Sequence, residues 1–276
     1  MSDARALLRG AGLSPKKSFG QNFLVAPHVV ESIARACVPD AEIGRAHVLE
    51  LGAGLGVLTK ALAARAKRVV AVERDRDLVP LLESELAPFD DKVEIIEGDA
   101  QTADPSVLLA AADGPRVLCG NLPYQITGRL LEQATVHADS IERAVFMVQL
   151  EVAERLAAEP GTKEYGGLTV FVRAAFRTDK LFNVSKGSFH PPPDVTSAVI
   201  LLEALRPRRA EETPTFRALV RGAFGMRRKT LRNAWASVAS SEEVARAASA
   251  AGVSLDARGE TLSVDDFAAV AKALEG

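Results

Sequence analysis

The chain has 276 residues, of which 47% are hydrophobic and 25% are charged, and its 34 basic and 36 acidic residues leave a net charge of −2. These ordinary values exclude intrinsic disorder, collagen and a disulfide-rich scaffold. The two cysteines, Cys37 and Cys119, cannot build a disulfide framework or a cysteine zinc site, and four scattered histidines predict no metal site. The length predicts one large domain, or one large and one small domain.

The N-terminal region and the hydrophobic pattern bear on where the protein acts. No apolar run approaches the roughly 20 residues of a membrane span. The first 20 residues carry four basic residues with no apolar run between them, which does not match a signal peptide. We therefore expect a cytoplasmic protein, and because the sequence has no obvious interface stripe, we expect a monomer.

Residues 46–150 alternate short β-rich segments with amphipathic helical patterns, which is typical of βαβ units and a mostly parallel sheet. The predicted strands are residues 46–51, 68–73, 92–97, 115–120 and 144–149. The predicted helices are residues 27–37, 57–66, 78–87 and 128–137. Further along, residues 168–176 favour a helix, and residues 195–202 a strand that could pair with residues 181–184. The pattern predicts an α/β domain.

The pattern changes near residue 205, where a polar linker containing Pro207 and Pro214 leads into helical segments only. The predicted helices are residues 215–224, 229–239, 242–251 and 264–274. Ser241 and Ser263 stand at N-cap positions, and Asp266, three residues after Ser263, resembles the second half of a capping box. We therefore predict an α/β domain over residues 1–204 and a small helical domain over residues 205–276.

Basic residues concentrate near the start of the helical domain. Nine of them lie between Arg206 and Arg232, against two acidic residues, although the whole chain is slightly acidic. Such a cluster forms either a solvated helix face or a surface that binds a polyanion. By itself the cluster favours the first interpretation.

The first strand ends in a glycine-rich turn. The segment ELGAGLG at residues 50–56 leads directly into a helix, and glycines at this place let the backbone approach a nucleotide-like ligand at the carboxyl edge of the sheet. Glu73 ends the next strand, 21 residues after Gly52, where a carboxylate can accept hydrogen bonds from both hydroxyls of a ribose. A tight turn beside an exposed carboxylate would give the same pattern, but the strand-turn-helix context favours a ligand site.

Both NAD and S-adenosylmethionine fit these features, and three details favour S-adenosylmethionine. The glycine spacing is GxGxG rather than the GxGxxG of pyrophosphate-binding turns. Glu50 precedes the turn, and a carboxylate there suits the cationic amino-acid end of S-adenosylmethionine. Asp99 ends the third strand, where it can accept a hydrogen bond from an adenine amino group. We therefore predict S-adenosylmethionine as the cofactor, and no metal.

The fourth strand is followed directly by Asn121-Leu122-Pro123-Tyr124. The exocyclic amine of adenine is a poor nucleophile because its lone pair is delocalised into the ring. The Asn121 carbonyl and a backbone carbonyl can accept both N–H hydrogens and direct the nitrogen lone pair at a sulfonium methyl. Pro123 stiffens the turn, and Tyr124 offers a face on which a flipped base can stack. An ordinary turn after a strand is the alternative, which the upstream cofactor motifs disfavour.

Seven segments resemble the KsgA-type ribosomal RNA adenine dimethyltransferases, also called RsmA. They are residues 17–24 (KSFGQNFL), 50–56, 121–124, 151–156 (EVAERL), 165–168 (YGGL), 189–199 (FHPPPDVTSAV) and 227–233 (RRKTLRN). The resemblance implies a Rossmann-like S-adenosylmethionine-dependent methyltransferase fold with a small C-terminal helical domain that binds RNA. It also implies double methylation of two adjacent adenosines in a hairpin loop near the 3′ end of small-subunit rRNA, within the precursor of the small ribosomal subunit.

The resemblance further implies roles for individual residues. Residues 21–24 resemble the family's N-terminal lid, and Phe189 resembles a second aromatic wall opposite Tyr124. The implied cofactor site comprises Asn22, Leu24, Glu50, Gly52, Gly54, Glu73, Asp99 and Asn121. The implied acceptor site comprises Asn121, Leu122, Pro123, Tyr124 and Phe189. The implied RNA contacts are Arg221, Arg227, Arg228, Lys229 and Arg232.

Some residues depart from the family pattern. Ser18 stands where many relatives carry arginine, and Leu150 stands where lysine is frequent. His190 follows Phe189 as it does in the related erythromycin-resistance methyltransferases, which act on large-subunit rRNA. Two alternatives therefore stay open: a large-subunit adenine methyltransferase of the resistance type, and a ribosome-assembly or nucleic-acid-binding factor with little catalysis.

Overall fold

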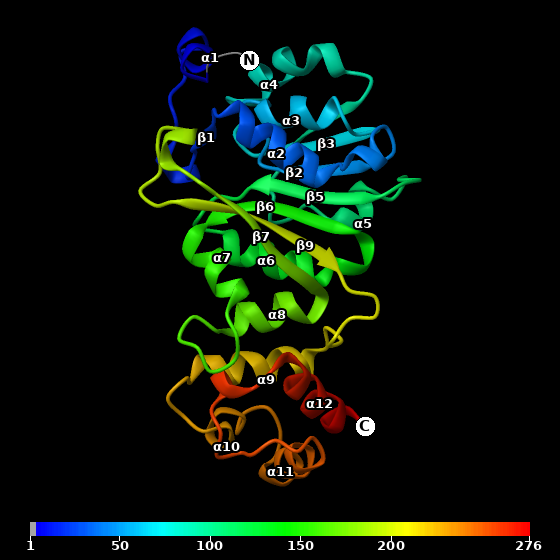
Figure 1. Ribbon diagram of the computed structural model, residues 1–276, viewed down its shortest axis with the longest axis vertical. Coiled ribbons are helices and arrows are strands. Elements are labelled where there is room, and N and C mark those ends of the chain that lie inside the picture. The colour runs from blue at the N-terminus through cyan, green and yellow to red at the C-terminus, as the bar shows by residue number, and fades with distance from the viewer. Residues whose placement is uncertain (1–3) are drawn as a thin grey trace. The chain divides into compact units, whose positions relative to one another are not determined.

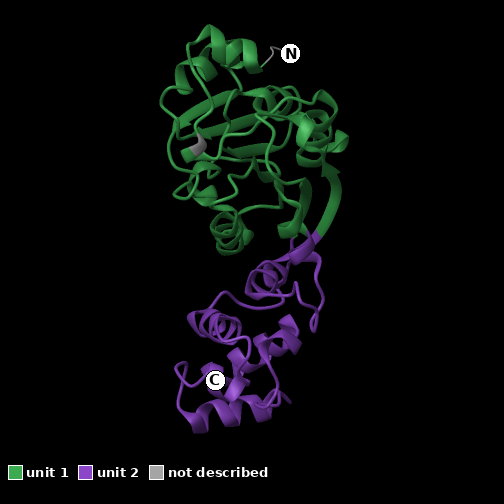
Figure 2. Cartoon of the chain, turned by 90° about the vertical axis from the view of Figure 1, so that its left-hand side faces the viewer, with its two compact units in different colours: residues 1–153, 179–203 green, residues 154–178, 204–276 purple. Residues whose placement is uncertain are grey.

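The computed structural model describes residues 4–276, apart from the side chain of Lys17, and Figure 1 shows its helices and strands. The chain forms two compact units (Figure 2). Unit 1 comprises residues up to 153 together with 179–203, and unit 2 comprises residues 154–178 and 204–276. Among the described residues, no helix is long and apolar enough to cross a membrane.

Unit 1 is built on a seven-stranded sheet with the order β4-β3-β2-β5-β6-β9-β7. Its strands are β2 (His47–Leu51), β3 (Arg68–Glu73), β4 (Val93–Glu97), β5 (Arg116–Asn121), β6 (Arg143–Gln149), β7 (Phe176–Val184) and β9 (Ser197–Ala204). The first five run parallel, and β9 pairs antiparallel with β6. The five predicted parallel strands are confirmed to within one residue at each end, because β-branched runs bounded by polar turns mark buried parallel strands clearly.

Helices cover this sheet and supply much of its core. They are α2 (Pro27–Cys37), α3 (Val57–Ala63), α4 (Val79–Leu86), α5 (Pro105–Leu108) and α6 (Thr127–Val136). Ile33 of α2 and Leu62 of α3 are buried in one cluster with Val48 and Val117 of the central strands. The predicted helix 27–37 is confirmed at both ends, with proline in the first turn, where its missing N–H costs no hydrogen bond.

The N-terminal part of unit 1 pairs with a segment far along the chain. After α1 (Ala4–Gly10), the two-residue strand β1 (Phe23–Leu24) runs antiparallel to β8 (Phe189–His190), with Leu24 opposite Phe189. Neither short strand was predicted, since two residues carry no periodicity. The pairing places Leu24 and Phe189 in the same core cluster as the central strands.

Unit 2 is mainly helical. Its helices are α8 (Gly167–Ala175), α9 (Pro214–Gly225), α10 (Leu231–Ala234), α11 (Ser241–Ala250) and α12 (Val264–Glu275), while α7 (Leu150–Ala157) begins in unit 1. Phe171 of α8 packs edge-on against Phe216 of α9, and Trp235 packs likewise against Phe267 of α12. The Trp235 ring is fully buried and its Nε1 donates to the Leu219 carbonyl (2.8 Å).

The two units divide the chain differently from the predicted domains in one segment. The predicted boundary after residue 204 lies one residue from the point where unit 1 ends, but residues 154–178 belong to unit 2. The reason is the apolar face of α8, whose Val170, Phe171 and Ala174 are buried in one cluster with residues of α9 and α12. A pattern of apolar residues marks a buried face and does not name the element that covers it.

Two helix termini in unit 2 differ from the prediction. The predicted helix 229–239 is reduced to α10, because the chain turns after Trp235, whose ring is fixed in the core. The N-cap of α11 is Ser240 rather than Ser241, and its Oγ accepts from the Glu243 amide (3.3 Å). The capping box of α12 is confirmed: Ser263 Oγ accepts from the Asp266 amide (3.1 Å) and Asp266 Oδ2 accepts from the Ser263 amide (2.8 Å).

Candidate active site

A cavity in unit 1 lies at the carboxyl ends of the parallel strands. The chain proceeds from β2 to β3 and β4 on one side and then returns to β5 on the other, so β2 and β5 border the switch point at which open α/β sheets bind ligands. The cavity is lined by residues that the sequence analysis selected from positions as distant as 22 and 121: Asn22, Leu24, Glu50, Gly52, Gly54, Glu73, Asp99, Asn121 and Pro123. The fold therefore gathers all eight predicted cofactor residues around one space.

The turn after β2 and the end of β3 are bonded to each other. Gly52 and Gly54 have φ angles of 79° and 57°, in the left-handed region that favours glycine. The Gly54 amide donates to Glu73 Oε2 (2.7 Å), and the Asp75 amide donates to Glu73 Oε1 (2.8 Å). Burial raises the pKa of Glu73 despite these bonds. Two backbone donors thus fix this carboxyl group, and each oxygen keeps a lone pair for a ligand hydroxyl.

Glu50 is buried beside the cavity, and its Oε2 has no hydrogen-bond partner. Burial raises the pKa of Glu50 to about 8. Ionising a buried carboxyl group is costly unless a cation or a donor reaches its oxygen. The amino group of S-adenosylmethionine is such a cation, so an orphaned oxygen at this place fits the predicted cofactor.

Asn121, the last residue of β5, lines the cavity. Its Nδ2 donates to the Asn22 carbonyl (2.9 Å), which leaves Oδ1 as the acceptor for a substrate. The turn that follows is held by Leu122, whose amide donates to the Met147 carbonyl (3.1 Å), and by the Pro123 carbonyl, which accepts from Thr127 Oγ1 (3.0 Å). The amide is therefore oriented, as an acceptor for an amine requires.

Three predicted acceptor residues do not line this cavity. Leu122 is buried, and the half-buried Tyr124 exchanges a hydrogen bond with Ser197 Oγ (2.8 Å). Phe189 is only 3% exposed and packs in the main core cluster beside Leu24, its partner in the β1–β8 pair. The predicted stacking of an adenine between Tyr124 and Phe189 stays a prediction.

Asp99 lines the cavity together with Arg74 and Phe19, which were not predicted as site residues. Asp99 Oδ1 accepts from the Gln101 amide (2.9 Å), and Arg74 is 3.6 Å from its other oxygen. The Arg74 guanidinium also lies over the Phe19 ring, 5.2 Å from its centroid. Phe19 lies in the matched segment 17–24 and could have been selected there, whereas Arg74 gives no signal beyond its place after Glu73.

The five predicted RNA contacts are exposed residues of unit 2. Arg227, Arg228 and Lys229 lie on the loop between α9 and α10, with Arg221 in α9 and Arg232 in α10. Arg227 Nη2 donates to the Lys163 carbonyl (3.0 Å) and lies 3.4 Å from Glu260 Oε2. Arg227 therefore also holds neighbouring segments of unit 2 together, which sequence position alone does not reveal.

Comparison with known proteins identifies the family. The family model for ribosomal RNA adenine dimethylase matches residues 12–275. A ribosomal RNA small subunit methyltransferase A from Anaeromyxobacter sp. (strain K) is 44% identical, over 98% of this chain and 97% of that protein. The protein of the same name from Geobacter metallireducens is 43% identical, over 97% of this chain and 98% of that protein.

Solved structures share the fold. A dimethyladenosine transferase from Plasmodium falciparum superposes with a TM-score of 0.73 at 24% identity, covering 90% of this chain and 95% of that chain. The 23S rRNA methyltransferase ErmE superposes with a TM-score of 0.63 at 27% identity, covering 92% of this chain and all of that chain. The predicted Rossmann-like methyltransferase fold is confirmed. The chain belongs to the ribosomal RNA adenine dimethylase family of S-adenosylmethionine-dependent methyltransferases.

Proposed function

We propose that this protein transfers methyl groups from S-adenosylmethionine to the exocyclic amines of two adjacent adenosines in a hairpin loop near the 3′ end of small-subunit rRNA. One observation carries the chemistry: Asn121, whose Nδ2 is bound to the Asn22 carbonyl, lines the same cavity as Glu50 and Glu73. The substrate assignment is supported by the 44% identity to a small-subunit enzyme, against 27% to ErmE.

The cofactor would be held along the carboxyl edge of the sheet. Glu73 would accept from the ribose hydroxyls, Glu50 would bind the amino group, and Asp99 would accept from the adenine amine. Gly52 and Gly54 leave room for the backbone to approach the ligand, and Asn22 and Leu24 line the same cavity. When bound, S-adenosylmethionine supplies a methyl group activated by its positively charged sulfur.

The acceptor adenine would be oriented by the segment 121–124. Asn121 Oδ1 accepts one N–H of the amine and a neighbouring backbone carbonyl accepts the other, so the nitrogen lone pair points away from the ring plane. For each methyl gained, the nitrogen would form a bond to the methyl carbon while the sulfur–methyl bond breaks. The sulfur would keep the bonding pair and leave as the neutral thioether of S-adenosylhomocysteine, and the nitrogen would lose one proton. Tyr124 and Phe189 would stack against the base, each contact contributing roughly 1–3 kcal/mol. This requires the base to leave its stack.

RNA would be held mainly by unit 2. The exposed Arg221, Arg228, Lys229 and Arg232, with Arg227, would contact phosphates of the rRNA. The partner would be the precursor of the small ribosomal subunit, on which a cytoplasmic monomer could act during assembly. No cavity-lining residue is a thiol or an imidazole, so the proposed site contains acceptors and carboxylates suited to orientation rather than a nucleophile.

The experiment is transfer of labelled methyl groups to ribosomal subunits that lack adenine dimethylation, followed by mapping of the labelled nucleotides. We expect label on two adjacent adenosines of the small subunit. Asn121→Ala should lose transfer in single-turnover assays at saturating S-adenosylmethionine, because the side chain orients the amine. Saturating cofactor removes any effect that the lost bond to the Asn22 carbonyl has on binding.

Other outcomes would assign another function. Label on large-subunit rRNA would support a resistance-type methyltransferase. Binding to small subunits without any transfer would support an assembly factor. Asn121→Ala with the wild-type single-turnover rate would contradict the role of the carboxamide.

A further inference from the structure

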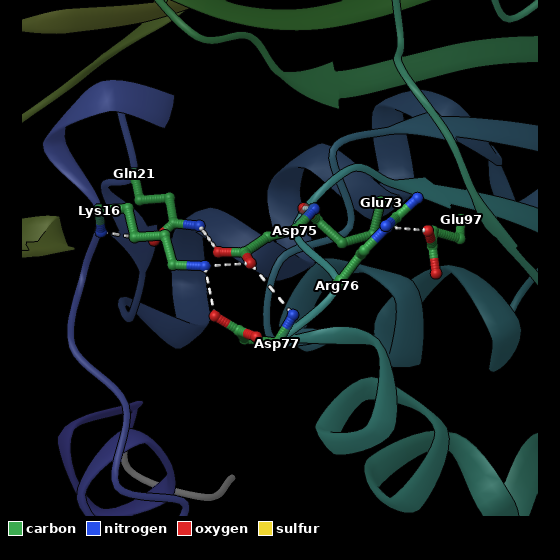
Figure 3. A network of polar contacts seen from close by, with 7 residues as sticks. All are labelled: Lys16, Gln21, Glu73, Asp75, Arg76, Asp77 and Glu97. Carbon is green, nitrogen blue, oxygen red and sulfur yellow. Dashed lines mark hydrogen bonds and ion pairs between the residues drawn. The ribbon is translucent and has the colours of Figure 1, made fainter.

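The N-terminal segment that lines the cavity is fastened on two sides. We call residues 16–24 the strap. On one side, the Asn22 carbonyl accepts from Asn121 Nδ2 (2.9 Å). On the other side, Lys16 and Gln21 bind Asp75, which follows β3 two residues after Glu73 (Figure 3). The strap therefore links the β5 end, where the amine acceptor lies, to the β3 end, where the ribose acceptor lies.

At Asp75 a basic side chain faces the carboxylate, and both carboxylate oxygens accept hydrogen bonds. Lys16 Nζ lies 2.5 Å from Asp75 Oδ1 and 2.6 Å from Asp77 Oδ2. Gln21 Nε2 donates to Asp75 Oδ2 (2.7 Å), and Gln21 Oε1 accepts from the Lys16 amide (2.7 Å). Each oxygen of Asp75 is thus bound by a different side chain of the strap.

Asp75 depends on the strap because it is buried. The residue is 2% exposed, and burial by itself raises the pKa of its carboxyl group. The hydrogen bonds from Lys16, Gln21 and the Asp77 amide, together with the charge of Lys16, hold that pKa below its ordinary value. While the strap is closed, Lys16 supplies the charge that faces this buried carboxylate. Removing that charge would leave the carboxylate unpaired in the closed arrangement, which is strongly unfavourable. The closed strap therefore depends on the Lys16–Asp75 pair.

The turn that follows β3 (residues 74–77) is bonded to Glu73, the proposed ribose acceptor. The Asp75 amide donates to Glu73 Oε1 (2.8 Å), and the Asp77 amide donates to Asp75 Oδ1 (3.1 Å). A second contact between the turn and the strap is the Arg74 guanidinium over the Phe19 ring. Movement of the strap and alignment of Glu73 are therefore coupled through one short stretch of backbone.

We infer that Asp75 is a positioning residue for the cofactor. By holding Lys16 and Gln21, it keeps the strap against the cavity, and S-adenosylmethionine and its product S-adenosylhomocysteine leave only when this contact opens. The inference rests on the proposed function, since it takes S-adenosylmethionine as the occupant of the cavity. Its consequence is a separation of effects, in which loss of the contact accelerates release and weakens binding while the Asn121 side of the strap stays fastened.

The test measures S-adenosylmethionine affinity by calorimetry and S-adenosylhomocysteine release by stopped flow in the full chain. In Lys16→Met we expect affinity to fall about tenfold, as it would if the closed strap became populated only about one tenth of the time. The fall should come from faster release, and it should raise KM for the cofactor much more than it lowers kcat. Lys16→Arg, which keeps the charge, should restore most of the affinity.

Lys67→Met is the matched control. Lys67 Nζ pairs with Asp113 (2.6 Å) on the surface of the same unit, just before β3 begins, and does not line the cavity. This variant should bind cofactor as the wild type does. Asp75→Asn should weaken binding like Lys16→Met. If the buried Asp75 variant fails to fold, the Lys16 series still decides.

The outcomes separate the two proposals. If the wild-type protein binds the cofactor and Lys16→Met has the same affinity and release rate, the role of Asp75 is overturned and the proposed function stands. Wild-type protein that binds no S-adenosylmethionine would overturn both. A lower melting temperature in Lys16→Met with unchanged affinity would also overturn the inference, because it is the result of a merely structural contact.

Discussion

At the residue scale, burial disfavours the ionised form of the Glu50 carboxyl group beside the cavity. The carboxyl group is 2% exposed, its Oε2 has no partner, and burial raises its pKa to about 8. Near neutral pH the ligand-free protein therefore keeps this group largely protonated. A cationic ligand group at Oε2 would favour the ionised form and lower the pKa.

Cofactor binding should therefore release a proton from Glu50. At pH 7 we expect up to about one proton to leave for each S-adenosylmethionine bound, which calorimetry in buffers of different ionisation enthalpy measures directly. Glu50→Gln should bind more weakly and release none. Proton release that is the same in the variant would place the titrating group elsewhere.

The same shift affects stability in the ligand-free protein. A folded-state pKa near 8, against 4.5 for the exposed group, means that the folded state binds the proton more tightly. The contribution of Glu50 to the free energy of unfolding is therefore fully present below pH 4.5 and is lost as the pH rises towards 8. The melting temperature of Glu50→Gln should depend less on pH across this window.

Phe189 has one role according to the family resemblance and a different environment in the structure. The resemblance implies a stacking wall, but the side chain is 3% exposed in the core. We expect Phe189→Leu to slow methyl transfer by about 5- to 150-fold, since a lost stacking contact is worth roughly 1–3 kcal/mol, with little change in cofactor affinity. Full activity with a lower melting temperature would instead assign Phe189 to the core.

At the scale of elements, α12 shows how a local signal fixes a helix start. Ser263 and Asp266 form a reciprocal capping box, and the helix then buries Val264, Phe267 and Val270 in the core of unit 2. The cap satisfies amides that otherwise lack partners at a helix N-terminus.

Loss of this cap should destabilise unit 2 without changing its fold. Ser263→Ala should lower the free energy of unfolding by about 0.5–2 kcal/mol, measured by denaturant titration. Ser254→Ala, on a loop before α12, is the comparison, because Ser254 caps no α-helix. An equal effect of both substitutions would contradict the capping role.

At the scale of the whole molecule, charge is divided between the units. Unit 1 carries 18 basic and 24 acidic residues, net −6, whereas unit 2 carries 16 basic and 12 acidic residues, net +4. A net negative unit repels phosphates on average. Contacts with RNA phosphates are therefore expected to concentrate on unit 2, and on its exposed loop between α9 and α10.

The loop can be tested apart from the structural role of Arg227. If Arg228 and Lys229 both contact phosphates, replacing both with alanine should flatten the slope of log affinity against log salt by about 1.4, at ~0.7 per contact. Cofactor affinity should not change. The charge-matched control is Arg246→Ala with Lys272→Ala, two exposed residues of unit 2 outside the basic cluster. An unchanged slope in the loop variant would place the RNA elsewhere.

The sequence by itself determined the parallel strands, most helices and the convergence of Glu50, Glu73 and Asn121 on one cavity. Buried parallel strands appear as β-branched runs, and their carboxyl ends must meet at one edge, so Glu50, Glu73 and Asn121 could be predicted to converge. Ser263 with Asp266 could be predicted because a capping box spans three residues. These features are local, or follow from local features through a fixed topology.

Only the tertiary structure decided the features that depend on distant neighbours. Lys16 meets Asp75 across 59 positions, Phe189 is covered by the β1–β8 pairing, and α8 joins unit 2 because its apolar face packs there. The orphaned oxygen of Glu50 likewise depends on everything that surrounds it. Side-chain patterns record that a face is apolar or a residue charged, but the partner is chosen by three-dimensional packing, which no local pattern encodes.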